Sequence, residues 1–128
     1  NDPDKACDIY RRECSVAILC RYFDIMGGTI ANGGINPGTK KHVVNKENIQ
    51  PILAEMMMNG LYENTGNWLY STGLPGKSGV GGGILAVVPG KCALAVFAPP
   101  LDIHGNSVKG KKVGAYLSEK LGWSLFNK

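Results

Sequence analysis

The sequence lacks any apolar run of the ~18 to 20 residues that a membrane-spanning helix needs, which excludes a helical integral membrane protein. It also lacks a dense basic patch, because the net charge is only +4 and the lysines and arginines are scattered with few aromatic residues between them. A nucleic-acid-binding surface is therefore poorly supported. With 44% hydrophobic and 19% charged residues among 128, the composition is typical of one globular domain or a large part of one.

Cysteine pairs with the spacing of metal ligands are absent as well. The four cysteines form no CxxC motif and no Cys/His pattern, and they are Cys7, Cys14, Cys20 and Cys92. Three fall on apolar helical stripes and one in a predicted strand, so we interpret them as buried, reduced thiols of a cytoplasmic protein. A mitochondrial location is the alternative for a eukaryotic source. His42 and His104 are isolated, and we expect neither to bind metal; the sequence predicts no metal and no cofactor.

Two nucleotide-binding motifs are excluded by counting glycines. A Walker phosphate loop needs a glycine five residues before Gly76-Lys77-Ser78, and this position is Ser71. The dinucleotide fingerprint needs its third glycine at Ile84 and must open a helix, whereas the glycines here lead into a predicted strand. The Gly-rich stretch 73–83 therefore needs another explanation.

The Gly-rich stretch 73–83 places a cation and a hydroxyl beside main chain that carries no shielding side chains. Glycine lets a ligand approach backbone N–H groups closely. Lys77 and Ser78 beside such groups favour binding of an anion or of a developing oxyanion. The same composition also fits a flexible connection with a solvated lysine, so both interpretations stay open from the residues alone.

Helical periodicity dominates the first sixty residues. Asp2-Pro3-Asp4 supplies an acidic cap and a proline at the first helical position, and apolar positions then recur with a helical period as far as residue 17. A second helix is predicted over residues 20–31, where the pair Gly27-Gly28 indicates close approach of a neighbouring element. A third helix is predicted from about Asn48 to residue 59, because Pro51 is tolerated only in a first turn.

The periodicity changes after Gly60. Residues 68–70 predict a short strand, and residues 80–88 and 92–98 predict two strands that form an antiparallel hairpin. The continuous apolar character of this hairpin indicates that helices cover both of its faces. A last helix is predicted from Asn106-Ser107 to residue 122. The order of elements predicts an α+β fold, with an antiparallel sheet packed with helices.

Six short segments form a series that spans nearly the whole chain. They are Cys14-Ser15-Val16, Ala31-Asn32-Gly33-Gly34, Gly60-Leu61-Tyr62, residues 73–80, Pro99-Pro100-Leu101-Asp102 and Gly105-Asn106-Ser107. In order and spacing they resemble the glutaminases, serine-dependent glutamine amidohydrolases with a β-lactamase/transpeptidase-like fold. The resemblance implies that residues 1–128 are the C-terminal part of a single glutaminase catalytic domain. It also implies hydrolysis of L-glutamine to L-glutamate and ammonia through a serine acyl-enzyme.

The resemblance implies roles for individual residues. Tyr10 matches a substrate-contacting tyrosine, Tyr62 matches a tyrosine implicated in proton transfer, and Val80 matches the residue whose backbone N–H lines the oxyanion hole. Lys77-Ser78-Gly79 resembles the Lys-Thr/Ser-Gly motif on the active-site edge strand of the wider superfamily. A tyrosine acts as a base only when a nearby cation lowers its pKa from about 10, and Lys77 is one candidate for that cation. Without the resemblance, both tyrosines read as packing aromatics.

The Ser-x-x-Lys motif that carries the nucleophile in this family is absent. The residues three positions after each serine are Ile18, Leu74, Gly81, Gly110, Leu121 and Asn127. The family places the motif upstream of the segments found here. We therefore expect the nucleophile to lie outside this chain and the chain alone to be inactive.

Two other functions stay open. A non-catalytic binding or assembly module could keep the same scaffold, and a substituted upstream motif would favour it. A penicillin-recognising or β-lactamase-like acyltransferase is also possible within the superfamily, although Tyr62 and the Gly-rich stretch match the glutaminases specifically. The resemblance further implies L-glutamine as ligand and a homo-oligomer, dimer or tetramer, and we expect no nucleic-acid or membrane partner.

Overall fold

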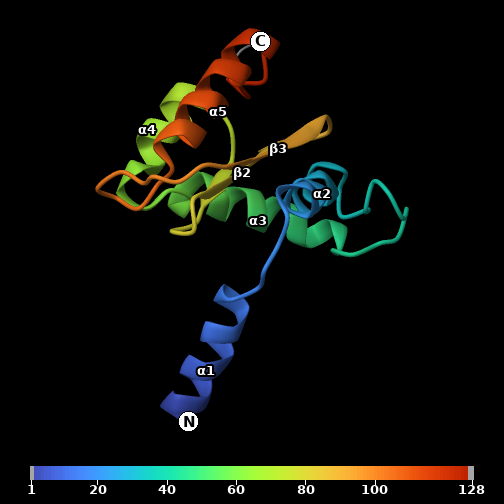
Figure 1. Cartoon of the computed structure of the whole chain (residues 1–128). Helices are drawn as coiled ribbons and strands as arrows, with labels where there is room; N and C mark the ends of the chain where they lie inside the picture. The colour runs from blue at the N-terminus through green and yellow to red at the C-terminus, as the bar shows by residue number, and fades with distance from the viewer. Residues whose placement is uncertain (1, 127–128) are drawn as a thin grey trace.

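Three antiparallel strands form the centre of the computed structural model, which describes residues 2–126 (Figure 1). β1 (Gly76–Ser78), β2 (Gly83–Val88) and β3 (Cys92–Phe97) follow one another across the sheet, so β2 is central and β1 lies at an edge. The predicted hairpin is confirmed, but its first strand begins at Gly83 rather than at residue 80. Gly90, with a φ of 74°, makes the left-handed turn between β2 and β3.

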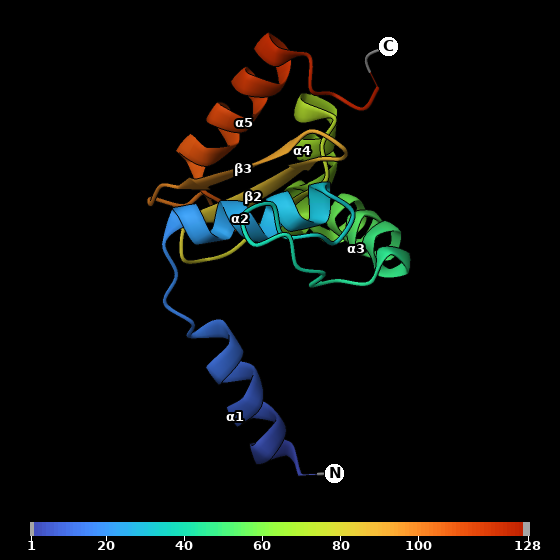
Figure 2. The same cartoon turned by 90° about the vertical axis from the view of Figure 1, so that its right-hand side faces the viewer.

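Helices cover both faces of the sheet (Figures 1 and 2). α2 (Cys20–Ala31) lies across one face, and α3 (Lys46–Asn59) packs at its C-terminal end. α5 (Val108–Leu121) contacts the sheet from the other side, with α4 (Thr65–Thr72) beside it. The predicted α+β arrangement, an antiparallel sheet packed with helices, is confirmed.

The side chains of β2 alternate between two hydrophobic clusters. Ile84, Ala86 and Val88 join the cluster around Trp68 of α4. Val87 points the other way and joins a cluster with residues of α2 and α3. Because every side chain from Ile84 to Val88 is buried, both faces of this strand exclude water, as its continuous apolar sequence indicates.

A glycine in α2 permits the close packing of this helix on the hairpin. A Cβ atom added to Gly27 would lie 2.6 Å from a methyl carbon of Leu85 and 2.7 Å from the Cβ of Ala93. No real side chain fits at such distances. The close approach predicted from the Gly27-Gly28 pair is therefore confirmed at its first member.

α1 (Pro3–Cys14) begins where predicted but has no partner within residues 2–126. The Asp2 carboxylate caps it and accepts hydrogen bonds from the backbone N–H groups of Asp4 and Lys5 at 3.1 and 3.2 Å. None of its residues is buried, and the helix extends away from the rest of the fold (Figures 1 and 2). The predicted burial of its two cysteines is wrong, and Cys20 at the start of α2 is exposed as well.

Two predicted elements differ in the structure. Residues 68–70 lie in the helix α4, not in a strand, because Thr65, Trp68 and Thr72 are buried at helical spacing while Tyr70 is 94% exposed. α3 begins at Lys46 rather than near Asn48, so Pro51 lies beyond the first turn. Pro51 is exposed, which leaves its ring and its missing N–H on the solvent side of the helix.

Candidate active site

Three segments meet beside the edge strand β1. The first is residues 60–62, which lead into the 3₁₀ helix η1 (Tyr62–Asn64); the second is the β1–β2 turn, residues 79–82; the third is the loop 102–106. The Ser78 N–H donates to the Gly60 carbonyl at 2.9 Å, which ties the first segment to β1. The site predicted from the sequence therefore forms where segments far apart in the chain converge.

Gly105 shows how closely the third segment approaches the other two. A Cβ atom added to this glycine would lie 3.2 Å from Cγ1 of Val80 and 3.9 Å from Cε2 of Tyr62. Its φ of 81° also belongs to the left-handed region that favours glycine. Val80 and Tyr62, which are 18 residues apart in the sequence, consequently pack around one residue of the loop 102–106.

Val80 lies in the β1–β2 turn and not at the start of a strand, which corrects the sequence-based boundary. Gly79 donates to the Gly83 carbonyl at 3.0 Å and Gly82 donates to the Gly79 carbonyl at 2.9 Å, so the turn closes on itself. The Val80 side chain is 69% exposed. Within residues 2–126 no group accepts a hydrogen bond from the Val80 N–H, which leaves this donor available to a ligand.

Tyr62 adopts a backbone conformation that is rare for an aromatic residue. Its φ is 53°, in the left-handed region, and such strain in a bulky residue persists only where the surroundings impose it. Thr65 holds this turn in place, since its hydroxyl donates to the Tyr62 carbonyl at 2.7 Å and accepts from the Leu61 N–H at 2.9 Å. The Tyr62 side chain stays 44% exposed, so its phenol is accessible.

Lys77 lies against Tyr62. Its ammonium nitrogen is 5.0 Å from the centre of the Tyr62 ring, a cation–π distance, and it donates a hydrogen bond to the Ser78 carbonyl. Burial lowers the pKa of the Lys77 ammonium, even though the residue as a whole is exposed, because its charged end folds back onto the protein. The predicted proximity of a cation to the Tyr62 phenol is present in the structure.

An apolar groove of about 340 Å³ runs along the other side of the Lys77-Ser78-Gly79 motif. Val16, Ile18 and Phe23 form one wall and Phe97 closes it. The motif contributes backbone and the stem of Lys77 to this groove. Ser78 itself is buried and its hydroxyl donates to Asn106 Oδ1 at 2.6 Å, so its proton is already engaged within the protein.

Tyr10 is not in direct contact with the other predicted residues. It lies on α1 and is 70% exposed. Its pKa is raised, first by hydrogen bonding with the Cys14 side chain and then by the charge of that thiol, and the Tyr62 phenol adds to the increase. The two tyrosines therefore share an electrostatic environment, although α1 itself has no packing partner among residues 2–126.

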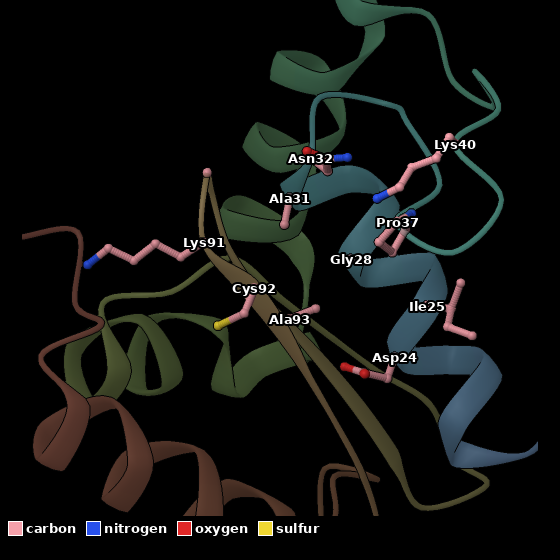
Figure 3. Close-up of a pocket in the computed structure, with 11 residues that line it drawn as sticks. Asp24, Ile25, Gly28, Ala31, Asn32, Pro37, Lys40, Lys91, Cys92 and Ala93 are labelled. Carbon is pink, nitrogen blue, oxygen red and sulfur yellow. The ribbon is translucent and has the colours of Figure 1, made fainter.

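A second cavity lies away from all of the predicted residues. It measures about 370 Å³ and lies between α2, the loop at Pro37–Lys40 and the β2–β3 turn. Figure 3 shows that the charged side chains around it do not converge, because Lys91 extends away from both Asp24 and Lys40. Its size alone assigns it no chemistry.

Asp102 and Asn106 are site residues to which the sequence assigned a motif but no role. Asn106 is fully buried, and its side chain bonds both Ser78 and the Leu61 carbonyl. Hydrogen bonding to Lys111 lowers the pKa of Asp102 to about 2, and backbone N–H groups of the loop add to this decrease against a small desolvation penalty. The only sequence signal was the Asn106-Ser107 pair, which reads as a helix cap.

The comparisons with known proteins are specific. The model of the family Glutaminase matches residues 1–126. The chain belongs to the glutaminase family. Glutaminase 1 of Shigella flexneri is 54% identical over 125 residues, which are 98% of this chain and 40% of that protein. Glutaminase 1 of Escherichia coli strain K12 is 53% identical over the same shares of both chains.

Solved glutaminase structures share the fold of this chain. A probable glutaminase, YbaS, superimposes with a TM-score of 0.97 at 52% identity, over all of this chain and 41% of that one. The Bacillus subtilis glutaminase YbgJ, in its covalent complex with 5-oxo-L-norleucine, gives a TM-score of 0.81 at 28% identity over 85% of this chain. This glutaminase chain thus has part of a β-lactamase-like fold, and it spans about 40% of the length of the relatives it matches.

No described helix, from residue 2 to residue 126, is long and apolar enough to cross a membrane. Over the same residues, no group of three or more His, Cys, Asp or Glu side chains gathers as metal ligands do. His104 instead lies 3.6 Å from a carboxylate oxygen of Glu63. The functional chemistry of the described residues therefore centres on Tyr62, Lys77 and the backbone of Val80.

Proposed function

We propose that this chain is the C-terminal part of a catalytic domain that hydrolyses L-glutamine to L-glutamate and ammonia through a serine acyl-enzyme. The observation that carries the proposal is the open Val80 N–H in the β1–β2 turn, beside the Tyr62–Lys77 pair, in a chain of the glutaminase family. Acyl transfer needs a donor fixed where negative charge develops on the carbonyl oxygen, and this N–H is such a donor.

The proposed reaction has two halves. A serine hydroxyl from the upstream part of the domain adds to the carboxamide carbon of glutamine, and its proton passes by way of the Tyr62 phenol to the departing ammonia. Water then hydrolyses the glutamyl ester and releases glutamate and the free serine. In both halves the carbonyl oxygen becomes negative, and the Val80 N–H stabilises it. Lys77 favours the ionised form of Tyr62 because its ammonium lies over the ring.

The remaining predicted residues have supporting roles in this proposal. Ser78 and Gly79 hold the turn that presents the Val80 N–H, and Gly79 leaves space for the substrate because nothing lies within 4 Å of a Cβ added there. Tyr10 contacts the substrate once the upstream part of the domain fills the gap around α1. No cofactor takes part in the scheme.

The proposal is tested by glutamate release from two proteins. The complete catalytic domain, with the upstream portion joined to this chain, is expected to turn over glutamine at an ordinary enzymatic rate of about 1 to 1000 per second. The 128-residue chain alone lacks a Ser-x-x-Lys motif, so its rate is expected to be lower by several orders of magnitude. Ordinary turnover by the chain alone would overturn the assignment of the nucleophile to the upstream portion.

Covalent labelling separates this proposal from its alternatives. 6-Diazo-5-oxo-L-norleucine reacts with the Bacillus subtilis glutaminase to give the complex with 5-oxo-L-norleucine. We expect the same reagent to label the complete domain of this protein with one equivalent, whereas a β-lactam leaves it unlabelled. Labelling by the β-lactam favours the penicillin-recognising alternative, and labelling by neither favours a non-catalytic binding or assembly module.

Two further expectations belong to the whole protein. We propose a homo-oligomer, dimer or tetramer, in which apolar side chains exposed on this chain are covered by other chains or by the upstream portion. Sedimentation of the complete domain measures this directly. A cytoplasmic location, or a mitochondrial one in a eukaryote, follows from the interpretation of the cysteines as reduced thiols, and fractionation of the source cells tests it.

A further inference from the structure

Asn106 joins three segments of the chain through one buried side chain. It is 0% exposed, its Oδ1 accepts from the Ser78 hydroxyl at 2.6 Å, and its Nδ2 donates to the Leu61 carbonyl at 3.2 Å. Its backbone is held equally firmly, since its N–H donates to Asp102 Oδ1 at 3.0 Å and its carbonyl accepts from the Asp102 N–H at 2.8 Å. Both polar ends of the amide are therefore satisfied by partners distant in the sequence.

The two side-chain partners of Asn106 directly precede the proposed reacting groups. Leu61 is the residue before Tyr62, and Ser78 is two residues before Val80. The backbone bond from Ser78 N–H to the Gly60 carbonyl joins the same two segments, but a single hydrogen bond leaves rotation about it free. The Asn106 amide supplies a second and a third attachment, which fix the orientation of one segment against the other.

The loop that carries Asn106 is itself rigid. One carboxylate oxygen of Asp102 accepts from the N–H groups of His104 and Asn106 at 2.9 and 3.0 Å, and the other accepts from the Lys111 ammonium of α5. Gly105, next to Asn106, is the residue around which Val80 and Tyr62 pack. Asn106 thus stands on a support anchored to α5 and reaches into the joint between the two segments.

We propose that Asn106 is a positioning residue, whose amide holds the Tyr62 phenol in register with the Val80 N–H. It has no exposed surface and acts only through Leu61 and Ser78. This inference rests on the proposed glutaminase function. A misplaced proton-transfer group or oxyanion donor weakens transition-state binding more than substrate binding, so the kinetic signature is a loss of kcat with little change in KM.

The test compares Asn106→Ala with a matched control in the complete domain. Asn106→Ala is expected to lower kcat about 10- to 100-fold while KM for glutamine stays within about threefold of the parent. Ser118→Ala is the control, because Ser118 is equally buried (1% exposed) and its hydroxyl also bonds a distant carbonyl, that of Thr72, but away from the site. It is expected to lower the unfolding midpoint and to leave kcat unchanged.

A second variant keeps the test decisive if Asn106→Ala does not fold. Asn106→Asp has the same shape, and when its carboxyl is protonated it can both accept from Ser78 and donate to the Leu61 carbonyl. Its kcat relative to the parent is therefore expected to rise as the pH falls, because only the neutral acid restores both bonds. A purely structural role would leave the kcat ratio of the folded proteins independent of pH.

The outcomes separate the two levels of the account. A parent domain that releases no glutamate overturns the proposed function itself. A parent that is active, with Asn106→Ala and Ser118→Ala equally stable and equally active, overturns the positioning role alone. Equal loss of kcat in both variants does the same, because it would show a general effect of lost stability. A selective kcat loss at Asn106, with the pH-dependent ratio in Asn106→Asp, supports it.

Discussion

α1 and α4 are two helices of opposite character. α1 is capped by the Asp2 carboxylate, carries the Arg11 and Arg12 ion pairs with Asp8, and buries none of its residues. α4 is shorter and has no side-chain cap, yet it buries the largest side chain of the core, Trp68. Local signals therefore form α1, whereas tertiary contacts form α4. The contrast shows that a well-marked helix need not be the one that stabilises the fold.

Trp68 shows what the tertiary contacts of α4 require. Its ring lies between two glycines, because a Cβ added to Gly76 of β1 or to Gly114 of α5 would approach it to 2.4 Å. Its indole N–H donates to the Leu74 carbonyl at 2.9 Å. The edge strand that carries Lys77 and Ser78 is thus packed directly on α4. Each region also carries a predicted site tyrosine, Tyr62 before α4 and Tyr10 on α1.

The two tyrosines give the prediction with the largest effect. In the complete domain, Tyr62→Phe is expected to lower kcat about 100- to 10,000-fold with KM little changed, because the phenol oxygen takes part in proton transfer. Tyr10→Phe is the contrasting change and is expected to alter mainly KM, by less than about tenfold. Steady-state kinetics with glutamine measures both. Unchanged turnover in Tyr62→Phe would reduce Tyr62 to a structural residue.

A glycine pair tests the packing of the α4 region. A Cβ added to Gly60 would lie 1.7 Å from the backbone oxygen of Gly76, so Gly60→Ala is expected to destabilise the fold by about 3 kcal/mol or more. Nothing lies within 4 Å of a Cβ added to Gly66 in α4, and Gly66→Ala is expected to be neutral or stabilising by up to about 1 kcal/mol. Urea unfolding of both variants checks this, and similar midpoints would contradict the tight contact at Gly60.

The Asp102 carboxylate predicts a pH dependence of stability. Its pKa is lowered from 3.8 to about 2, so its contribution is fully present above about pH 4 and is lost as the pH falls toward 2. We expect the parent to exceed Asp102→Asn in unfolding free energy by about 1 kcal/mol at neutral pH, a value reduced by solvent screening. The difference should shrink between pH 4 and 2 in an acid unfolding series. A constant difference would mean that the carboxylate charge contributes nothing.

The smallest effect is expected on α1. Ile9 is 51% exposed and packs against no other element within residues 2–126, so Ile9→Ser in this chain is expected to change the unfolding free energy by less than about 0.5 kcal/mol. Ile84→Ser in β2 is the matched change on the other side of the comparison, at 1% exposure, and should cost several times more. Thermal unfolding of both proteins measures the difference, and a large loss at Ile9 would reveal a packing partner for α1.

The sequence predicted the elements whose signals are local. The caps at Asp2 and Ser107, the hairpin turn at Gly90 and the close approach at Gly27 all lie where the pattern placed them. α4 was misread because a short apolar run has no clear period, and only its packing against β1 and α5 decides the matter. Burial of the cysteines on α1 was wrong for the same reason, since periodicity cannot tell which partner a stripe meets.

The same distinction holds within the candidate site. Tyr62, Val80 and the Lys77 motif were found from short motifs, but the strained φ of Tyr62 and the position of Val80 in a turn were not. Asn106 was seen only as a helix-capping residue, because its bonds join residues 45 and 28 positions away in the sequence. Long-range contacts of this kind leave no spacing signal.

The most direct measurement of the central claim is a crystal structure of the complete domain after reaction with 6-diazo-5-oxo-L-norleucine. The account predicts a covalent bond to a serine upstream of Asn1, with the carbonyl oxygen of the adduct about 2.7–3.1 Å from the Val80 backbone nitrogen. Tyr62 and Lys77 are expected to lie on either side of the attacked carbon and its phenol partner. An adduct whose oxygen points away from the β1–β2 turn, or no adduct at all, would contradict it.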